Sequence, residues 1–419
     1  MLYLIGGLYA CAFWIAGWKW PKIPLLLIFA LAPFQNDISS GAPWAPKDEE
    51  VFTGGPHFSI AEINLLLTLP LFFLRGRPLL RGPTFIPVVL YLCACLGSAF
   101  LNWRLTTTVS LTQIGMYLMI AVLVFTSFTS DPRDFRPALC GLVFVGVILA
   151  SAVIVTRSGY VLGLHKNGVG SSLAATVIVC AELWFGSTRR WPRIILGTAM
   201  ALLVAGLFFS LSRGGWLGAL CGVFLLLALR REFNTLLRLG LLLIPLIGIC
   251  WALLPDQARD YATGFDKENL NIRMRYESME FAQRQFAQSQ LLGVGVGLRK
   301  EYDATNLFWL TLAETGVLGL VTFLYLHWSL ARFVWVDHKR IAKSDPLFSL
   351  LALGGALVLS KFVHGMVDHY WSRGAIMAAW AAAGMATHAH FVLRQRMRPN
   401  RSSPTSPPEI PEIAAAIGQ

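Results

Sequence analysis

Long apolar runs separated by short polar segments make up most of this chain. We predict thirteen helices, at about 2–18, 22–35, 60–74, 85–101, 107–128, 138–156, 169–186, 194–210, 214–229, 237–254, 306–330, 347–363 and 374–391. A helix of about 20 apolar residues crosses the hydrocarbon core of a bilayer, whereas a membrane barrel shows short strands of alternating polarity. The pattern predicts an all-α polytopic integral membrane protein. Because the first two runs are short, about twelve or thirteen transmembrane helices are expected.

The composition supports this fold class and removes one class of function. Of the 419 residues, 55% are hydrophobic and only 14% are charged, with a net charge of +12. Soluble proteins carry about 25% charged residues. A positive balance of this kind is also typical of nucleic-acid-binding proteins. Here the basic residues are scattered among short loops, where membrane topology explains them. We therefore expect contact with membrane lipids and none with nucleic acid.

The distribution of Lys and Arg also predicts the orientation of the chain. These residues gather in alternate loops, near 19–22, 75–81, 133–136, 189–193, 230–238 and 332–343. Short loops rich in Lys and Arg remain cytoplasmic. The other loops, including 255–305 and 364–373, are therefore expected on the outer, periplasm-like face.

One long polar segment, residues 255–306, interrupts the apolar runs. Within it, residues 271–288 have the periodicity of a helix with two faces. The apolar stripe consists of Ile272, Tyr276, Met279, Ala282 and Phe286. The second face carries Arg273, Glu277, Glu280 and Arg284, which are spaced to form ion pairs along the helix. We predict an amphipathic helix on the outer side of the membrane.

Arg275 is the residue of this helix that fits neither face. It lies at the edge of the apolar stripe, and no acidic residue is three or four positions away. An arginine turned inward without a local partner requires an anion from elsewhere or must reach water. We therefore interpret Arg275 as a candidate catalytic residue, the alternative being a surface arginine or an ion pair with a distant acid.

A second arginine stands in the motif Ser212-Arg213-Gly214-Gly215-Trp216, which joins two apolar runs at the outer interface. A charge at such a place is costly and functional by default, although Arg213 can instead be an interface anchor beside Trp216. Gly214 permits a close backbone approach, and with Ser212 it is a candidate substrate-binding residue. Two guanidinium groups from separate segments suit a diphosphate, because each binds phosphate oxygens in bidentate fashion.

Further candidate substrate-binding residues lie downstream of the amphipathic helix. Gly293 and Gly295 belong to a glycine-rich turn, for which a simple helix-ending turn is at least as good an interpretation. Thr305 and Asn306 lie where the chain re-enters the membrane. Glu314 lies about two helical turns deeper, where a carboxylate is costly and is either structural or paired with an arginine.

His364 and Asp368 are candidate catalytic residues on the outer face. They stand one helical turn apart in His364-Gly365-Met366-Val367-Asp368-His369, so they can form a hydrogen-bonded pair. Such a pair can serve as a general base, and a structural interface pair is the alternative. A metal site that includes His369 would lack a second cluster to complete it. No metal and no other cofactor is expected.

Several of these motifs occur in an order that resembles the shared domain of bacterial O-antigen ligases and O-antigen polymerases. The resemblance rests on Phe209-Ser210-Leu211-Ser212-Arg213-Gly214-Gly215-Trp216, on Arg275 ahead of Gly293-Val294-Gly295, on Asn306-Leu307 and on Ala313-Glu314-Thr315-Gly316. It covers about residues 165–325 closely. We accordingly divide the chain into N-terminal helices (1–164), a ligase-like core (165–330) that includes the loop 255–305, C-terminal helices (331–393) and a disordered cytoplasmic tail (394–419).

The resemblance implies a C-type membrane glycosyltransferase in the bacterial inner membrane, active on the periplasmic face. Such an enzyme transfers a glycan from an undecaprenyl-diphosphate donor to an acceptor hydroxyl without a metal or a nucleotide. The acceptor is lipid A core for a ligase and a growing polysaccharide for a polymerase. By this resemblance Arg213 and Arg275 hold the donor diphosphate, which agrees with their chemistry.

The chain departs from the ligase pattern at one position. Ligases of this family carry a histidine directly before the asparagine at the re-entry point, whereas this chain has Thr305. The segment between Gly297 and Asn306 is also short for a ligase. Three alternatives follow: His364 with Asp368 supplies the base, the protein is a polymerase of surface or exopolysaccharide, or catalysis is lost.

A polytopic transporter or lipid flippase is the alternative from a different class. Transporters place charges along a central pathway and commonly show paired halves. The candidate charges of this chain gather at one face, and no internal repeat is evident. The sequence therefore favours an interfacial enzyme.

Overall fold

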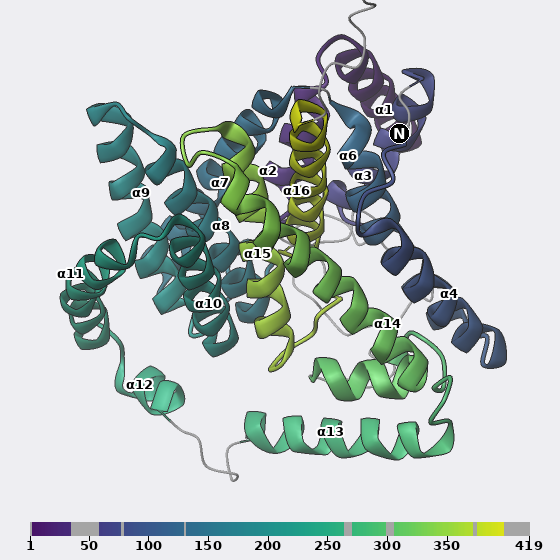
Figure 1. The fold of residues 1–419 in the computed structure, drawn as a ribbon. Coiled ribbons are helices and arrows are strands. Elements are labelled where there is room, and N and C mark those ends of the chain that lie inside the picture. Colours follow the sequence, from purple (N-terminus) through teal and green to yellow (C-terminus); the bar gives the residue numbers. More distant parts are fainter. Residues whose placement is uncertain are drawn as a thin grey trace, which may run out of the picture.

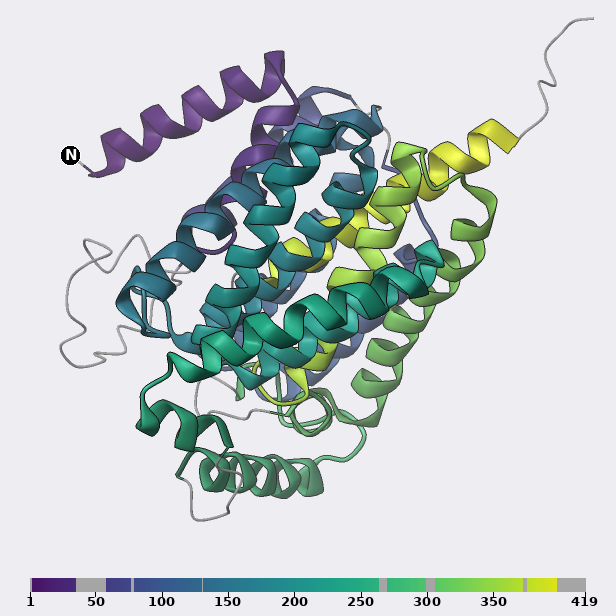
Figure 2. The ribbon, with the colours of Figure 1, turned by 90° about the vertical axis from the view of Figure 1, so that its left-hand side faces the viewer.

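The computed structural model describes residues 2–34, 58–76, 79–129, 131–263, 270–298, 306–371 and 375–397. Over these ranges the regular structure is helical, apart from one isolated bridge between Val161 and Leu164. Each of the thirteen predicted segments contains helix. The helices form one elongated bundle with two further helices outside one end (Figures 1 and 2). The predicted all-α fold is confirmed.

The helices follow one another in this order: α1 (Leu2–Lys19), α2 (Lys22–Leu31), α3 (Ile60–Leu74), α4 (Phe85–Leu101), α5 (Leu105–Gly115), the π-helix η2 (Met116–Val124), α6 (Phe125–Phe128), the 3₁₀ turn η3 (Pro132–Asp134), α7 (Phe135–Thr156), α8 (Lys166–Gly186), α9 (Arg190–Phe209), α10 (Arg213–Arg230), α11 (Phe233–Ala252), α12 (Asp256–Thr263), α13 (Leu270–Gln288), α14 (Leu307–Asp337), the 3₁₀ turn η5 (His338–Arg340), α15 (Pro346–Gly365) and α16 (Ala375–Met397). Within the described ranges, seven helical segments are long and apolar enough to cross a membrane unaided, and they comprise α7 to α10 and α14 to α16.

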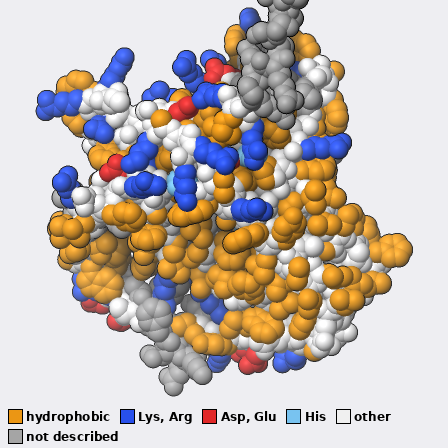
Figure 3. Space-filling model, in the orientation of Figure 1, with side chains coloured by type: hydrophobic (Ala, Val, Ile, Leu, Met, Phe, Trp, Pro, Cys, Tyr) orange, Lys and Arg blue, Asp and Glu red, His pale blue; other side chains and the backbone are white. Residues whose placement is uncertain are grey.

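The surface of the bundle matches a bilayer. Large apolar side chains are exposed along its flanks, among them Ile15, Val155, Trp191, Leu220, Ile244 and Trp328. An apolar surface of this extent is unfavourable in water and favourable against lipid tails. Lys and Arg gather toward the end of the bundle opposite α13 (Figure 3). The protein is therefore a multi-pass membrane protein with chemically different ends.

The last helix, α16, forms the centre of the bundle. Within its most apolar stretch 89% of the residues are buried, against 22% for α9 at the rim. Small residues make this possible, because they let helix backbones approach closely. A Cβ added at Gly384 would lie only 2.3 Å from the Ala121 carbonyl oxygen on η2. On the other side of α16, a Cβ added at Gly354 of α15 would lie 2.4 Å from the Ala386 Cβ.

The predicted amphipathic helix is α13, which runs across the end of the bundle outside the other helices (Figure 1). Its covered face agrees with the predicted apolar stripe at Ile272, Met279, Ala282 and Phe286 and differs from it at Tyr276. Ser278 and Ala282 are buried and Arg275 is half-buried, whereas Tyr276 is 47% exposed. The cause is the partner of α13: Ala282 packs with Leu310 of α14 in a small separate core, and this contact sets the rotation of the helix. Arg275 is consequently turned toward the bundle.

Helix α14 is broken at Gly316, whose φ of 65° and ψ of −166° are not helical. The turn that follows α13 fills this break. Val317 donates its backbone N–H to the Gln290 carbonyl at 2.9 Å, and Leu318 donates to the Leu291 carbonyl at 3.3 Å. A Cβ at Gly316 would lie 2.3 Å from the Leu291 carbonyl oxygen. Only glycine combines this conformation with this approach, so α14 and the turn form one interlocked unit.

Candidate functional site

The predicted motif at Ser212 forms a tight turn between two membrane helices. Helix α9 ends at Phe209 and α10 begins at Arg213, and Leu211 between them has a left-handed φ of 54°. Ser212 is 1% exposed and caps α10, because its Oγ accepts the backbone N–H of Gly215 at 3.3 Å. This turn holds Arg213, which is half-buried, at the first residue of α10.

The two glycines of the motif bring other helices into contact with this turn. A Cβ at Gly215 would lie 2.8 Å from the carbonyl carbon of Gly170 on α8. A Cβ at Gly214 would lie 2.6 Å from Cδ2 of His364 on α15. The predicted close approach is thus present at both positions. It places the first turn of α10 directly against the imidazole of His364.

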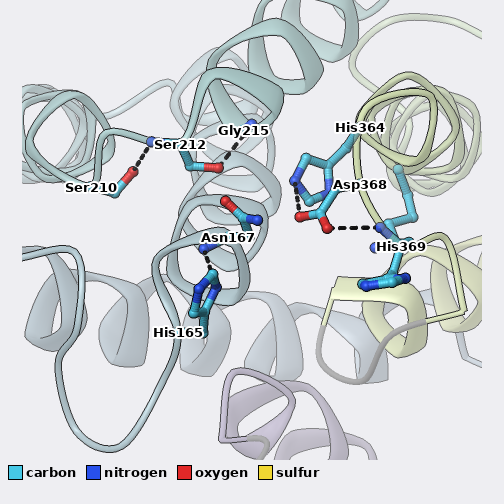
Figure 4. Close-up of polar contacts among 9 residues, drawn as sticks. His165, Asn167, Ser210, Ser212, Gly215, His364, Asp368 and His369 are labelled. Carbon is cyan, nitrogen blue, oxygen red and sulfur yellow. Dashed lines mark hydrogen bonds and ion pairs between the residues drawn. The ribbon is translucent and has the colours of Figure 1, made fainter. Parts of the chain in front are cut away.

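His364 and Asp368 lie side by side at ion-pair distance, without the predicted hydrogen bond. Their Nε2 and Oδ2 atoms are 3.4 Å apart, and the side chains are 4% and 10% exposed (Figure 4). Asp368 is oriented by a second contact, because its Oδ1 accepts the backbone N–H of His369 at 2.8 Å. Within the described part of the chain, neither ring nitrogen of His364 has a hydrogen-bond partner. A buried imidazole of this kind is available to a ligand.

Arg275 reaches the same end of the molecule from α13. Its charge is close enough to act electrostatically on His364. No acidic side chain of the described ranges lies within ion-pair distance of Arg275. By contrast, Arg273 is 61% exposed and pairs with Glu277 at 3.5 Å, as predicted. We call Arg213, Arg275, His364 and Asp368 the outer-end site; their predicted catalytic roles remain predictions.

Three helices begin around the outer-end site. His165 caps α8 by accepting the Asn167 N–H at 3.3 Å, and Ser212 caps α10. Asn306 caps α14 by accepting the N–H groups of Phe308 and Trp309, while its Nδ2 donates to the Met366 carbonyl at 3.1 Å. Figure 4 shows the starts of α8 and α10 beside the His364–Asp368 pair. Because the N-terminus of a helix carries partial positive charge, this arrangement favours an anion.

The other predicted substrate-binding residues are engaged in the interlocked unit of α14. Gly295 donates its N–H to the Glu314 carbonyl at 3.1 Å and to Ser98 Oγ at 3.0 Å. Gly293 donates to the Ser289 carbonyl at 2.8 Å. The Glu314 carboxylate is buried and accepts the N–H of Gly297 at 2.8 Å. These contacts give the residues a structural role, and binding of substrate by them remains a prediction. Thr305 lies outside the described residues.

Lys361 is a charged residue near the outer-end site that the prediction omitted. It is 3% exposed on α15, one turn before His364, and its Nζ donates to the His369 carbonyl at 2.9 Å. A pocket of about 210 Å³ between α8 and α15 is lined by Lys361, His364, Ser171 and Ser360. The signal was present in the sequence, since a lysine inside an apolar run is rare and functional by default.

A second omission lies deeper in the bundle. Glu182 of α8 and Arg230 of α10 form a bidentate ion pair, with side chains 0% and 5% exposed. Ser349 of α15 donates to the same carboxylate at 2.6 Å. This triad ties α8 to α10 and α15, the two membrane helices that carry Arg213 and His364. Over the described ranges, no group of three or more His, Cys, Asp or Glu side chains is arranged to hold a metal ion.

These features define a class of protein: a multi-pass helical membrane protein with an anion-favouring polar site at one end of its bundle. Residues 198–324 match the sequence model of the family described as O-Antigen ligase. The predicted resemblance to O-antigen ligases and O-antigen polymerases is thereby confirmed over this domain. No curated protein matches the chain.

The matched stretch runs from within α9 to within α14, so it starts later than the predicted 165–325. It contains Arg213, Arg275, Asn306 and Glu314, whereas His364 and Asp368 lie beyond it. The matched domain supports membrane glycosyltransferase activity of the ligase or polymerase type.

Proposed function

We propose that the protein transfers a glycan from an undecaprenyl-diphosphate donor to an acceptor hydroxyl at the outer-end site. The observation that carries this proposal is the meeting of three distant segments. The first turn of α10 packs on His364 through Gly214, and the charge of Arg275 on α13 acts on the same imidazole. Arg213 begins the helical turn that packs on His364, and no carboxylate of the described ranges lies within ion-pair distance of Arg275; both facts support the proposal.

In this proposal Arg213 and Arg275 bind the donor diphosphate. Guanidinium groups match phosphate oxygens in bidentate geometry, and the starts of α8, α10 and α14 add partial positive charge. The acceptor hydroxyl attacks the anomeric carbon of the donor sugar. The bond between that carbon and the diphosphate oxygen breaks, and undecaprenyl diphosphate leaves with the electron pair. The arginines stabilise the charge that develops on this leaving group.

The hydroxyl proton passes to His364, and the neighbouring Asp368 carboxylate stabilises the imidazolium that forms. This assignment replaces the histidine that ligases carry at the position of Thr305. The burial of His364 and its contact with Gly214 support it, since the base then lies next to the residue that follows Arg213. The arginines supply the positive charge, so we propose that the reaction needs neither a metal ion nor a nucleotide.

We further propose that the outer-end site faces the periplasm and that the protein resides in the inner membrane. The support is the gathering of Lys and Arg at the opposite end of the bundle (Figure 3), which topology rules assign to the cytoplasm. The donor and the acceptor are both amphiphiles, so a site at the membrane boundary admits their polar heads while their tails stay in lipid.

A deletion strain tests the function. Deletion of a ligase is expected to leave lipid A core without long glycan. Deletion of a polymerase of the same family is expected to leave single glycan units, which are still attached or exported. The absence of histidine at Thr305 keeps the polymerase as the second candidate. Gel analysis of surface polysaccharide separates the two, and complementation with Arg213→Ala should fail to restore long chains although the protein is inserted. Normal chains in both the deletion and the Arg213→Ala strains would exclude the proposal.

A further inference from the structure

A buried ammonium lies beneath the outer-end site. Lys361 is 3% exposed on α15 inside a helix that crosses the membrane. Placing a lysine within the apolar region costs about 2.5–3.5 kcal/mol at the membrane centre and less toward its edge. The positive charge of a lysine at such a place is expected to be compensated by polar contacts. One of these contacts lies in the chain segment that follows α15.

The turn from His364 to Tyr370 is fastened at several points. Lys361 Nζ donates to the His369 carbonyl at 2.9 Å, from one turn below His364. Asp368 Oδ1 accepts the His369 N–H at 2.8 Å. Asn306 Nδ2 donates to the Met366 carbonyl at 3.1 Å. Both polar groups of the His369 backbone are thus bonded to charged side chains, and one of these is the carboxylate that faces His364.

We propose that Lys361 is a positioning residue, which fixes the turn that carries Asp368 against His364. This inference rests on the proposed function of His364 and Asp368 as the base. The His369 backbone links the two charges: its carbonyl accepts from Lys361 and its N–H donates to Asp368. A hydrogen bond with a charged donor is stronger and more directional than a neutral one, so loss of the ammonium frees the turn and misaligns the carboxylate.

Exchange for arginine tests the inference at constant charge. The pocket beside Lys361 has mostly small walls, with Ala174, Ala175 and Ala375 among the lining residues. Lys361→Arg keeps a charged donor near the His369 carbonyl. Lys361→Met keeps the length of the side chain and removes both the donor and the charge. Ser360→Ala alters the same pocket without touching the turn and is the matched control.

The experiment measures glycan transfer in membranes of a deletion strain that carry each variant, with undecaprenyl-diphosphate-linked glycan from the host strain added as donor. For Lys361→Met we expect turnover to fall at least about tenfold, while KM for the donor stays within about twofold. Lys361→Arg should recover most of the turnover, and Ser360→Ala should behave as wild type. If the methionine variant does not accumulate in the membrane, Lys361→Leu, which also lacks a donor and a charge, takes its place in the same comparison.

Three outcomes would overturn the inference: normal turnover in Lys361→Met, a raised KM with unchanged turnover, or no recovery in Lys361→Arg. The second would make the lysine a ligand of the donor, and the third would reduce it to packing. Measuring Arg213→Ala in the same assay distinguishes failure of the proposed glycan transfer from failure of the positioning role of Lys361. If Arg213→Ala is also fully active the proposed function fails, whereas activity in Lys361→Met alone removes only the positioning role.

Discussion

Arg275 offers a sharp test of the outer-end site because Arg273 provides a control on the same helix. The two arginines are two residues apart on α13 and therefore point in different directions. Arg275 is half-buried and lies within electrostatic range of His364, whereas Arg273 is 61% exposed and paired with Glu277. Replacing either by alanine removes the same charge from the same helix, so only the direction of the side chain distinguishes the variants.

The expected magnitudes differ by about two orders. Two charge-assisted hydrogen bonds from Arg275 to a diphosphate are worth about 1.5–3 kcal/mol each. At 1.36 kcal/mol for each tenfold change in rate, their loss slows transfer by about 100-fold to 10,000-fold. Partial exposure to water favours the lower end of this range. The exposed pair of Arg273 with Glu277 is worth about 0.2–0.5 kcal/mol, so Arg273→Ala should change transfer by no more than about twofold.

The assay follows the initial rate at which labelled sugar enters long surface glycan in a deletion strain. Immunoblots of the membrane fraction normalise each rate to the inserted protein. Arg275→Lys is a useful intermediate, because it keeps a charge without the bidentate geometry, and we expect it to fall between wild type and Arg275→Ala. Equal rates for Arg275→Ala and Arg273→Ala would refute the assignment of Arg275 to the donor.

Three other substitutions test separate parts of the structure. Gly316→Ala should destabilise the protein strongly, because its Cβ would lie 2.3 Å from the Leu291 carbonyl at a left-handed φ; a normal melting temperature in detergent would contradict the interlocked unit. Glu182→Ala leaves Arg230 buried without its partner and should lower the free energy of unfolding by about 3–5 kcal/mol. The denaturation midpoint should fall accordingly, and an unchanged midpoint would disprove this. Thr305→Ala should transfer glycan nearly as wild type, since threonine is a poor general base, and an inactive variant would show that the position matters.

Much of the fold was predictable because apolar runs of membrane length have few alternative structures. The break in α14 could not be predicted, because Thr315-Gly316 lies within an apolar run and a glycine there is compatible with a continuous helix. The rotation of α13 was also missed at Tyr276. Periodicity defines the apolar side of an isolated helix, whereas the contact of Ala282 with α14 decides which residues are covered.

The candidate site was predicted in part. Arg275 and the Ser212 motif stood out because polar residues next to apolar runs are conspicuous, and the pairing of His364 with Asp368 followed from their spacing of four. Their meeting at one place depends on the packing of α10 on α15, which no local pattern contains. Lys361 was overlooked because a single lysine does not disturb the hydropathy of its helix.

The central position of α16 has a consequence for biogenesis. The ribosome delivers this helix after the helices that it contacts, which include α15, α8, α14 and the π-helix η2. Those earlier helices must therefore wait in the bilayer around an unfilled axis until α16 is made, and they gain their final packing only then. A premature stop before residue 375 would remove the hub of the assembly instead of an appendage, leaving spans that quality-control proteases can recognise.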